Sequence, residues 1–194
     1  MVALRMRYLL WTIAFSWCLA AAAQASEDNV KLTELYKVDQ SSRQNGPIDW
    51  AKLNHEDEAR RVEVHRMLDA GEVRTGTDYY HAAMVYQHGQ TPDEYLLAHV
   101  LAMDAVARGS NEAKWLSAAT LDRYLRAIWQ PQVFGTQFQS RNGQQMEHET
   151  MYPSLASDSM RAALCVVGAD EQKAILNEVH QGKEFRSSHL KDCK

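Results

Sequence analysis

Apolar residues recur at spacings of three and four along most of this chain, and Gly or Pro interrupts the pattern at short intervals. This spacing is typical of amphipathic helices, whereas half-buried strands alternate with a period of two. The frequent breaks exclude one long helix. The pattern predicts seven helices, at about 29–42, 55–70, 78–88, 92–108, 111–129, 158–167 and 169–181.

The helix ends carry their own signals. Thr91-Pro92 is typical of an N-cap followed by the first helical residue, and Ser110 is the expected N-cap of the next helix. Gly71 and Gly109 are expected to end helices. The pair 78–88 and 92–108 forms a predicted helical hairpin, but no 34-residue period is present, so the sequence does not indicate a helical repeat array.

Residues 134–141 alternate in type and are followed by Asn142-Gly143, the dipeptide typical of a two-residue hairpin turn. Such a turn would place Gln137 opposite His148 on the paired strands. The fold class expected is therefore mainly α: a compact helical domain of about seven helices with one β-hairpin, preceded by a signal-peptide helix.

The predicted hairpin also assigns side chains to its two faces. Residues two apart on a strand share a face, so Phe134 and Phe138 would both pack against the helices. Gln137 and His148 would then face the other way, and Thr136 would lie opposite Glu149. A shift of one residue would exchange the two faces.

Residues 1–25 are typical of a cleavable secretory signal peptide. Arg5 and Arg7 form a short basic region, residues 8–23 carry no charge, and Ala23-Gln24-Ala25 suits signal peptidase. A membrane anchor is the alternative, but a spanning helix needs about 20 apolar residues. We expect a domain at 26–194, export to the periplasm or outside the cell, and no stable membrane insertion after cleavage.

Charge and cysteine content restrict the partners and the compartment. Cleavage removes two of the 21 basic residues and none of the 25 acidic residues, which leaves a formal charge of −6. Nucleic acid is therefore an unlikely partner on electrostatic grounds, and a small molecule, a peptide or an envelope component is expected instead. The remaining cysteines, Cys165 and Cys193, are expected to form a disulfide in an oxidising compartment.

The common catalytic and cofactor motifs are absent from the sequence. It contains no G-x-S-x-G, no P-loop, no dinucleotide fingerprint and no H-E-x-x-H, so neither a cofactor nor a metal is expected. His81, His88 and His99 fall in central helices, where isolated histidines are more often hydrogen-bonded core residues. The densest polar stretch includes Asp122 and Arg123. Asp122 lies beside an apolar helix face, so Arg123 or a backbone donor is expected to pair with it.

Several short segments resemble an uncharacterised bacterial family of exported helical domains with a D-R…Q-x-[YF]-G-T-Q signature. Its elements match, in order, Asp39-Gln40-Ser41-Ser42-Arg43, Gln87-His88-Gly89, Trp115–Arg123 and Pro131–Phe138. The similarity covers roughly residues 32–176. Because the family has no assigned activity, the resemblance implies domain limits and marks polar residues without indicating a reaction.

Two classes of function remain open. The first is a binding or interaction domain with a groove lined by Tyr79, Tyr80, Tyr86 and Trp115. The second is a hydrolase-type or transferase-type enzyme in which an acid or histidine acts as general base and arginine and amide groups bind the substrate. Its candidate catalytic residues are Asp39, Arg43, His88, Asp122, Arg123, Gln137 and His148. A buried polar network without catalytic function is the structural alternative for the same residues.

Overall fold

The protein is mainly helical in a computed structural model that describes residues 26–44, 47–139, 146–148, 150–152 and 154–183. Two short antiparallel strands accompany the helices, as predicted. The predicted signal peptide lies outside the described residues. The elements are α1 (Val30–Ser41), α2 (Trp50–Asp69), α3 (Gly76–Tyr86), α4 (Pro92–Ala107), α5 (Ala113–Ala127), β1 (Phe138–Gln139), β2 (Glu147–His148), α6 (Asp158–Ala163) and α7 (Ala169–His180).

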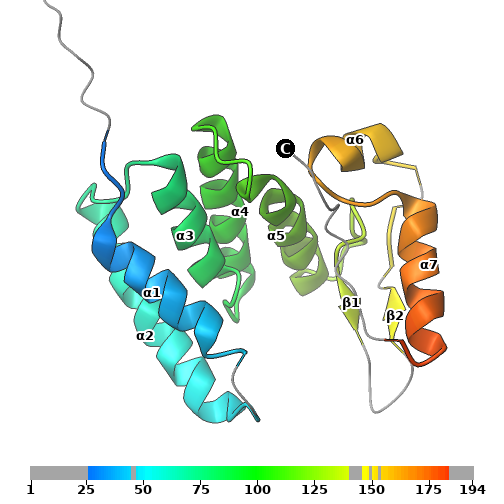
Figure 1. Ribbon diagram of the computed structural model, residues 1–194, viewed down its shortest axis with the longest axis horizontal. Helices are drawn as coiled ribbons and strands as arrows, with labels where there is room; N and C mark the ends of the chain where they lie inside the picture. Colours follow the sequence, from blue (N-terminus) through cyan, green and yellow to red (C-terminus); the bar gives the residue numbers. More distant parts are fainter. Residues whose placement is uncertain (1–25, 45–46, 140–145, 149, 153, 184–194) are drawn as a thin grey trace, which may run out of the picture.

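The helices α1 to α5 lie side by side, and the hairpin, α6 and α7 lie on the far side of α5 (Figure 1). The first core joins α1 to α5 and includes Leu32, Met67 and Leu116. A second, smaller core joins α5 to the C-terminal elements through Phe134 and Val166. Helix α5 therefore contributes to both cores. No helix in the described part of the chain is both long and apolar enough to cross a membrane.

Side-chain caps explain where most helices begin. Thr91 forms the predicted N-cap of α4, within a capping box completed by Glu94, and Thr75 begins α3 in the same way. Helix α2 begins five residues before the predicted start because the Asp49 side chain accepts from the backbone of Lys52. The prediction that Ser110 caps α5 was wrong. The N-cap of α5 has no side-chain hydrogen bond, and Ser110 instead contacts the Glu112 carboxylate.

The hairpin differs from its prediction in length and register. Phe138 pairs with His148, so the predicted pairing of Gln137 with His148 is wrong by one residue. Gln137 lies before β1 and donates a hydrogen bond to the carbonyl of Ala119 in α5, so it does not face away from the helices. Phe134 does pack in the second core. The predicted turn at Asn142-Gly143 and residue Glu149 lie outside the described residues.

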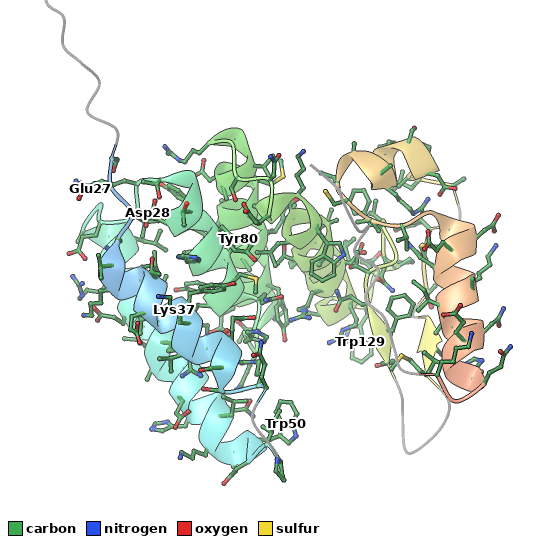
Figure 2. The ribbon with its side chains drawn as sticks, in the orientation of Figure 1. Glu27, Asp28, Lys37, Trp50, Tyr80 and Trp129 are labelled. Carbon is green, nitrogen blue, oxygen red and sulfur yellow. The ribbon has the colours of Figure 1, made fainter. Side chains whose placement is uncertain are left out.

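Two helices end with a residue other than glycine in the left-handed conformation. Gly71, Gly109 and Gly182 follow α2, α4 and α7 with positive φ, as expected for this position. Trp129 follows α5 with φ 62° and Cys165 follows α6 with φ 59°. The Trp129 side chain is exposed, with 88% of the residue surface accessible (Figure 2), so burial of its ring does not offset the backbone strain.

We predict that Trp129→Gly stabilises the fold. Glycine adopts a positive φ without a Cβ clash, and relief of this strain outweighs its larger unfolded-state entropy by about 0.5–1 kcal/mol. Urea unfolding measures the change. Trp129→Ala is the matched control, because it removes the same ring and keeps the Cβ. An equal effect of both substitutions would show that the ring, not the backbone, is responsible.

Candidate functional site

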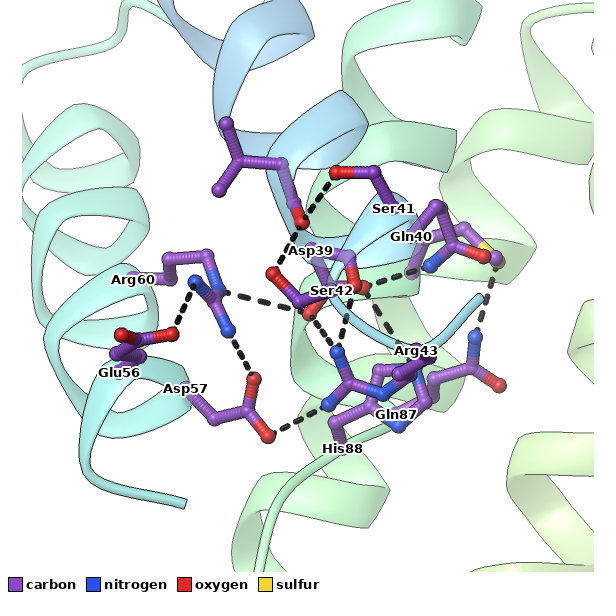
Figure 3. Close-up of polar contacts among 12 residues, drawn as sticks. Asp39, Gln40, Ser41, Ser42, Arg43, Glu56, Asp57, Arg60, Gln87 and His88 are labelled. Carbon is purple, nitrogen blue, oxygen red and sulfur yellow. Dashed lines mark hydrogen bonds and ion pairs between the residues drawn. The ribbon is translucent and has the colours of Figure 1, made fainter. Parts of the chain in front are cut away.

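A buried carboxylate lies at the centre of the charged residues between α1, α2 and the end of α3 (Figure 3). Asp39 comes from the last turn of α1 and has no solvent exposure. Its Oδ1 is 3.0 Å from Nη1 of Arg43, and its Oδ2 accepts from the amide of Gln40 at 2.6 Å. Arg43 lies four residues after Asp39, in the turn that follows α1, and this spacing brings the two side chains together.

Helix α2 supplies a second carboxylate and a second guanidinium. Asp57 accepts from Nη2 of Arg43 at 2.5 Å and from Nη2 of Arg60 at 2.5 Å. Arg43 thus bridges Asp39 on α1 and Asp57 on α2. Asp57 and Arg60 are buried, so their ion pair replaces the contacts that each charge would make with water.

His88 completes this group of residues from the segment that follows α3. Its Nε2 lies 3.6 Å from Oδ2 of Asp39, and Nε of Arg60 lies 3.6 Å from the other oxygen of Asp39. Both nitrogens are buried without a hydrogen bond to any described residue. The Nδ1 atom of His88 also has no partner among the described residues, but it is not buried. We call Asp39, Arg43, Asp57, Arg60 and His88 the His88 cluster.

The environment of the His88 cluster shifts the pKa values of three of its members. Burial raises the pKa of Asp39 to about 6, although Arg43 acts in the opposite direction. Burial, together with the charges of Arg43 and Arg123, lowers the pKa of His88 to about 3. For Asp57, burial acts to raise the pKa, but hydrogen bonds from Arg43 and Arg60 hold it below its usual value. His88 is therefore a neutral imidazole at neutral pH.

Arg123 joins the His88 cluster to the C-terminal part of the fold. Its Nη1 donates to the backbone carbonyl of Gln87, the residue before His88. Its Nε donates to the side-chain oxygen of Gln137 at 3.3 Å. Arg123 was one of the two partners expected for the Asp122 carboxylate, but it does not pair with Asp122.

Asp122 instead organises the loop that follows α5. Its two buried oxygens accept from the backbone N–H groups of Val133, Phe134 and Thr136 at 2.8–3.0 Å. They also accept from the hydroxyl of Thr136 at 2.8 Å. This confirms the expectation of backbone donors and explains why a strand does not begin at residue 134. Asp122 is a structural residue, because all four contacts hold the loop and none faces the His88 cluster.

The structure thus divides the candidate catalytic residues into three groups. Asp39, Arg43 and His88 come together, and Arg123 and Gln137 lie beside them. Asp122 is a loop anchor, and the backbone of His148 is in β2, paired with Phe138 rather than Gln137. Sequence analysis missed Asp57 and Arg60. Their spacing of three residues on the charged face of α2 is the signal that could have identified them.

The four aromatic residues of the predicted groove are divided between the two cores. Tyr86 is buried in the first core, Tyr79 and Tyr80 pack against that core, and Trp115 packs against the second. The structure has instead an open groove between α1 and α2, with a volume of about 480 Å³, which meets the His88 cluster only at Arg60. Its lining residues are Lys31, Glu34, Leu35, Val38, Glu56, Ala59 and Arg60.

Two other histidines have structural contacts. His81 is stacked on Tyr36 with ring centroids 4.2 Å apart, and Nδ1 of His99 lies 2.9 Å from the backbone carbonyl of Ser117. Within the described ranges, no three His, Cys, Asp or Glu side chains are placed to hold a metal ion. Comparison of the chain with protein-family models, curated proteins and solved structures finds no match.

We predict that Asp122→Asn destabilises the fold by about 2–4 kcal/mol, because the amide leaves a buried backbone donor without an acceptor. Urea unfolding measures the loss. Asp170→Asn is the matched control: this exposed carboxylate pairs with exposed Lys173, and its loss is expected to have a much smaller effect. Equal small effects of the two substitutions would contradict the anchoring role of Asp122.

Proposed function

We propose that this protein is a ligand-binding domain and that the His88 cluster is its binding site. The supporting observation is the pair of buried nitrogens, His88 Nε2 and Arg60 Nε, that face Asp39 at 3.6 Å without forming hydrogen bonds. Native proteins satisfy about nine in ten buried polar groups, so two unsatisfied nitrogens in one cluster require an explanation. A network with only a structural function gains stability by closing these contacts.

Partial solvent access supports a binding function over a sealed core network. The His88 side chain is 22% exposed and that of Arg43 is 17% exposed, whereas Asp39 is fully buried behind them. His88 therefore meets Asp39 with one ring nitrogen and solvent with the other. A ligand that contacts Nδ1 would reach the cluster at this edge, and binding would tighten the contacts to Asp39.

Catalysis is a second candidate function, favoured by the pairing of His88 with Asp39. A carboxylate that orients an imidazole is the arrangement used in acid–base catalysis of acyl and phosphoryl transfer. His88 would be the catalytic residue that contacts the substrate, and Asp39 would be a positioning residue, since it has no exposed surface. Conversion of a bound fragment by the protein would favour this hydrolase-type or transferase-type function over binding alone.

We further propose that the domain acts after export, with Cys165 and Cys193 joined in a disulfide. Cys165, which directly follows α6, is buried and has an interaction partner. Cys193 and residues 1–25 lie outside the described residues. We also propose that the chain belongs to the D-R…Q-x-[YF]-G-T-Q family. A small molecule, peptide or envelope component in that compartment would be the ligand.

We expect the secreted protein to begin at Ser26 and to be two hydrogens lighter without reductant than after reduction. Signal cleavage after Ala25 and one disulfide account for both values. Intact mass measurement before and after reduction, with alkylation, tests them together. An uncleaved Met1 would contradict signal cleavage, and alkylation of both thiols without reductant would contradict the disulfide.

Binding at the His88 cluster predicts a local NMR response to small ligands. We expect members of a fragment library that contains acids, amides and amines to shift the His88 imidazole signals. His65 on α2 is the matched control within the same molecule, because its side chain is 61% exposed and far less enclosed. Fragments that move neither ring, or both rings equally, would contradict a site at His88.

A further inference from the structure

Arg123 is a largely enclosed cation with no acidic partner in the described part of the chain. Its two hydrogen bonds go to neutral acceptors, the carbonyl of Gln87 and the side chain of Gln137. Its third nitrogen, Nη2, has no hydrogen-bond partner among the described residues and is not buried. An enclosed guanidinium without a carboxylate is costly, and an anionic ligand would offset this cost.

The charges around Arg123 add to the positive potential at this position. Burial lowers the pKa of Arg123, Tyr95 acts in the opposite direction, and the charges of Arg126 and Arg43 act with burial to lower it. At His88, the charges of Arg43, Arg123 and Arg60 all act to lower the pKa, and Asp57 acts against them. Three guanidinium groups, those of Arg43, Arg60 and Arg123, therefore act on His88 against the carboxylate of Asp57.

These observations lead us to infer that the site recognises a compact oxyanion, a carboxylate or phosphate group of the ligand, between Arg123 Nη2 and His88 Nδ1. This inference rests on the proposed ligand-binding function and specifies the chemistry of its ligand. Arg123 supplies the charge, since Arg43 and Arg60 are already engaged by Asp57.

The planar guanidinium also explains the choice of an oxyanion over a halide. Arginine donates through fixed N–H directions that match the oxygens of carboxylate and phosphate. Its orientation is set on two sides, by Gln87 and by Gln137, so Nη2 is held in place before a ligand arrives. The neutral imidazole of His88 carries one ring proton, so it donates from Nδ1 to the anion in the tautomer in which Nε2 is the acceptor.

Titration with inorganic phosphate, acetate and acetamide tests the inference at constant ionic strength set by potassium chloride. Acetate and acetamide have almost the same shape and differ in charge. We expect phosphate or acetate to shift the His88 imidazole signals in a saturable manner, and acetamide to bind at least 10-fold more weakly. The comparison of phosphate with acetate distinguishes the two sources of the oxyanion.

Variants of Arg123 test the residue itself. Arg123→Gln is expected to weaken anion binding about 10-fold or more, as for loss of a charged hydrogen bond. Arg123→Lys keeps the charge and is expected to retain part of the affinity. Arg108→Gln is the matched control, because Arg108 stacks on Tyr79 away from the cluster. Circular dichroism verifies that each variant is folded, and Arg123→Lys carries the test if Arg123→Gln does not fold.

The possible failures are distinguishable. If amide or amine fragments shift His88 while phosphate and acetate do not, the proposed binding function stands and the oxyanion inference is wrong. If no fragment or anion shifts His88, both are wrong. An equal loss of anion binding in Arg108→Gln and Arg123→Gln would show a general charge effect and would overturn the assignment to Arg123.

Discussion

The carboxylate of Asp122 determines how the C-terminal third of this protein is attached to the helices. Three backbone N–H groups and one hydroxyl from residues 133–136 converge on it within a buried interface. The loop is thereby held in an irregular conformation against α5, and the hairpin that follows starts in a defined position. The second core forms around this loop, since Phe134 both donates to Asp122 and packs among apolar residues.

The His88 cluster shows a different use of buried charge. Asp122 accepts four hydrogen bonds, whereas Asp39 is approached by two nitrogens that remain beyond hydrogen-bonding distance. Burial raises the pKa of Asp39 to about 6. Asp122 thus fixes a loop, whereas Asp39 leaves two neighbouring nitrogens without hydrogen bonds. The arrangement around Asp39 is the one expected where a ligand binds.

The sequence predicts the helices well because their signals are local. Capping residues such as Thr91 and helix-ending glycines act within a few residues, and apolar periodicity marks the buried faces. The hairpin register was missed because the decisive contact is tertiary: Asp122, 11 residues before Val133, takes the N–H groups that a strand would use. Similarly, Asp39 and Arg43 were identified as candidates, but Asp57 and Arg60 join them only through packing of α1 on α2.

Asp122 and Arg123 are consecutive residues whose side chains serve different parts of the molecule. Successive positions on an α-helix are rotated by roughly 100°, so the first side chain is directed to the loop and the second to Gln87 at the end of α3. The phase of α5 is therefore constrained from both sides. Insertion or deletion of a residue earlier in this helix would rotate both side chains away from their partners together. Changes of length in the exposed connection around residues 109–112 would not alter the rotation of α5 relative to its two partners. Proteins with this fold are therefore expected to tolerate insertions in that connection and not within α5.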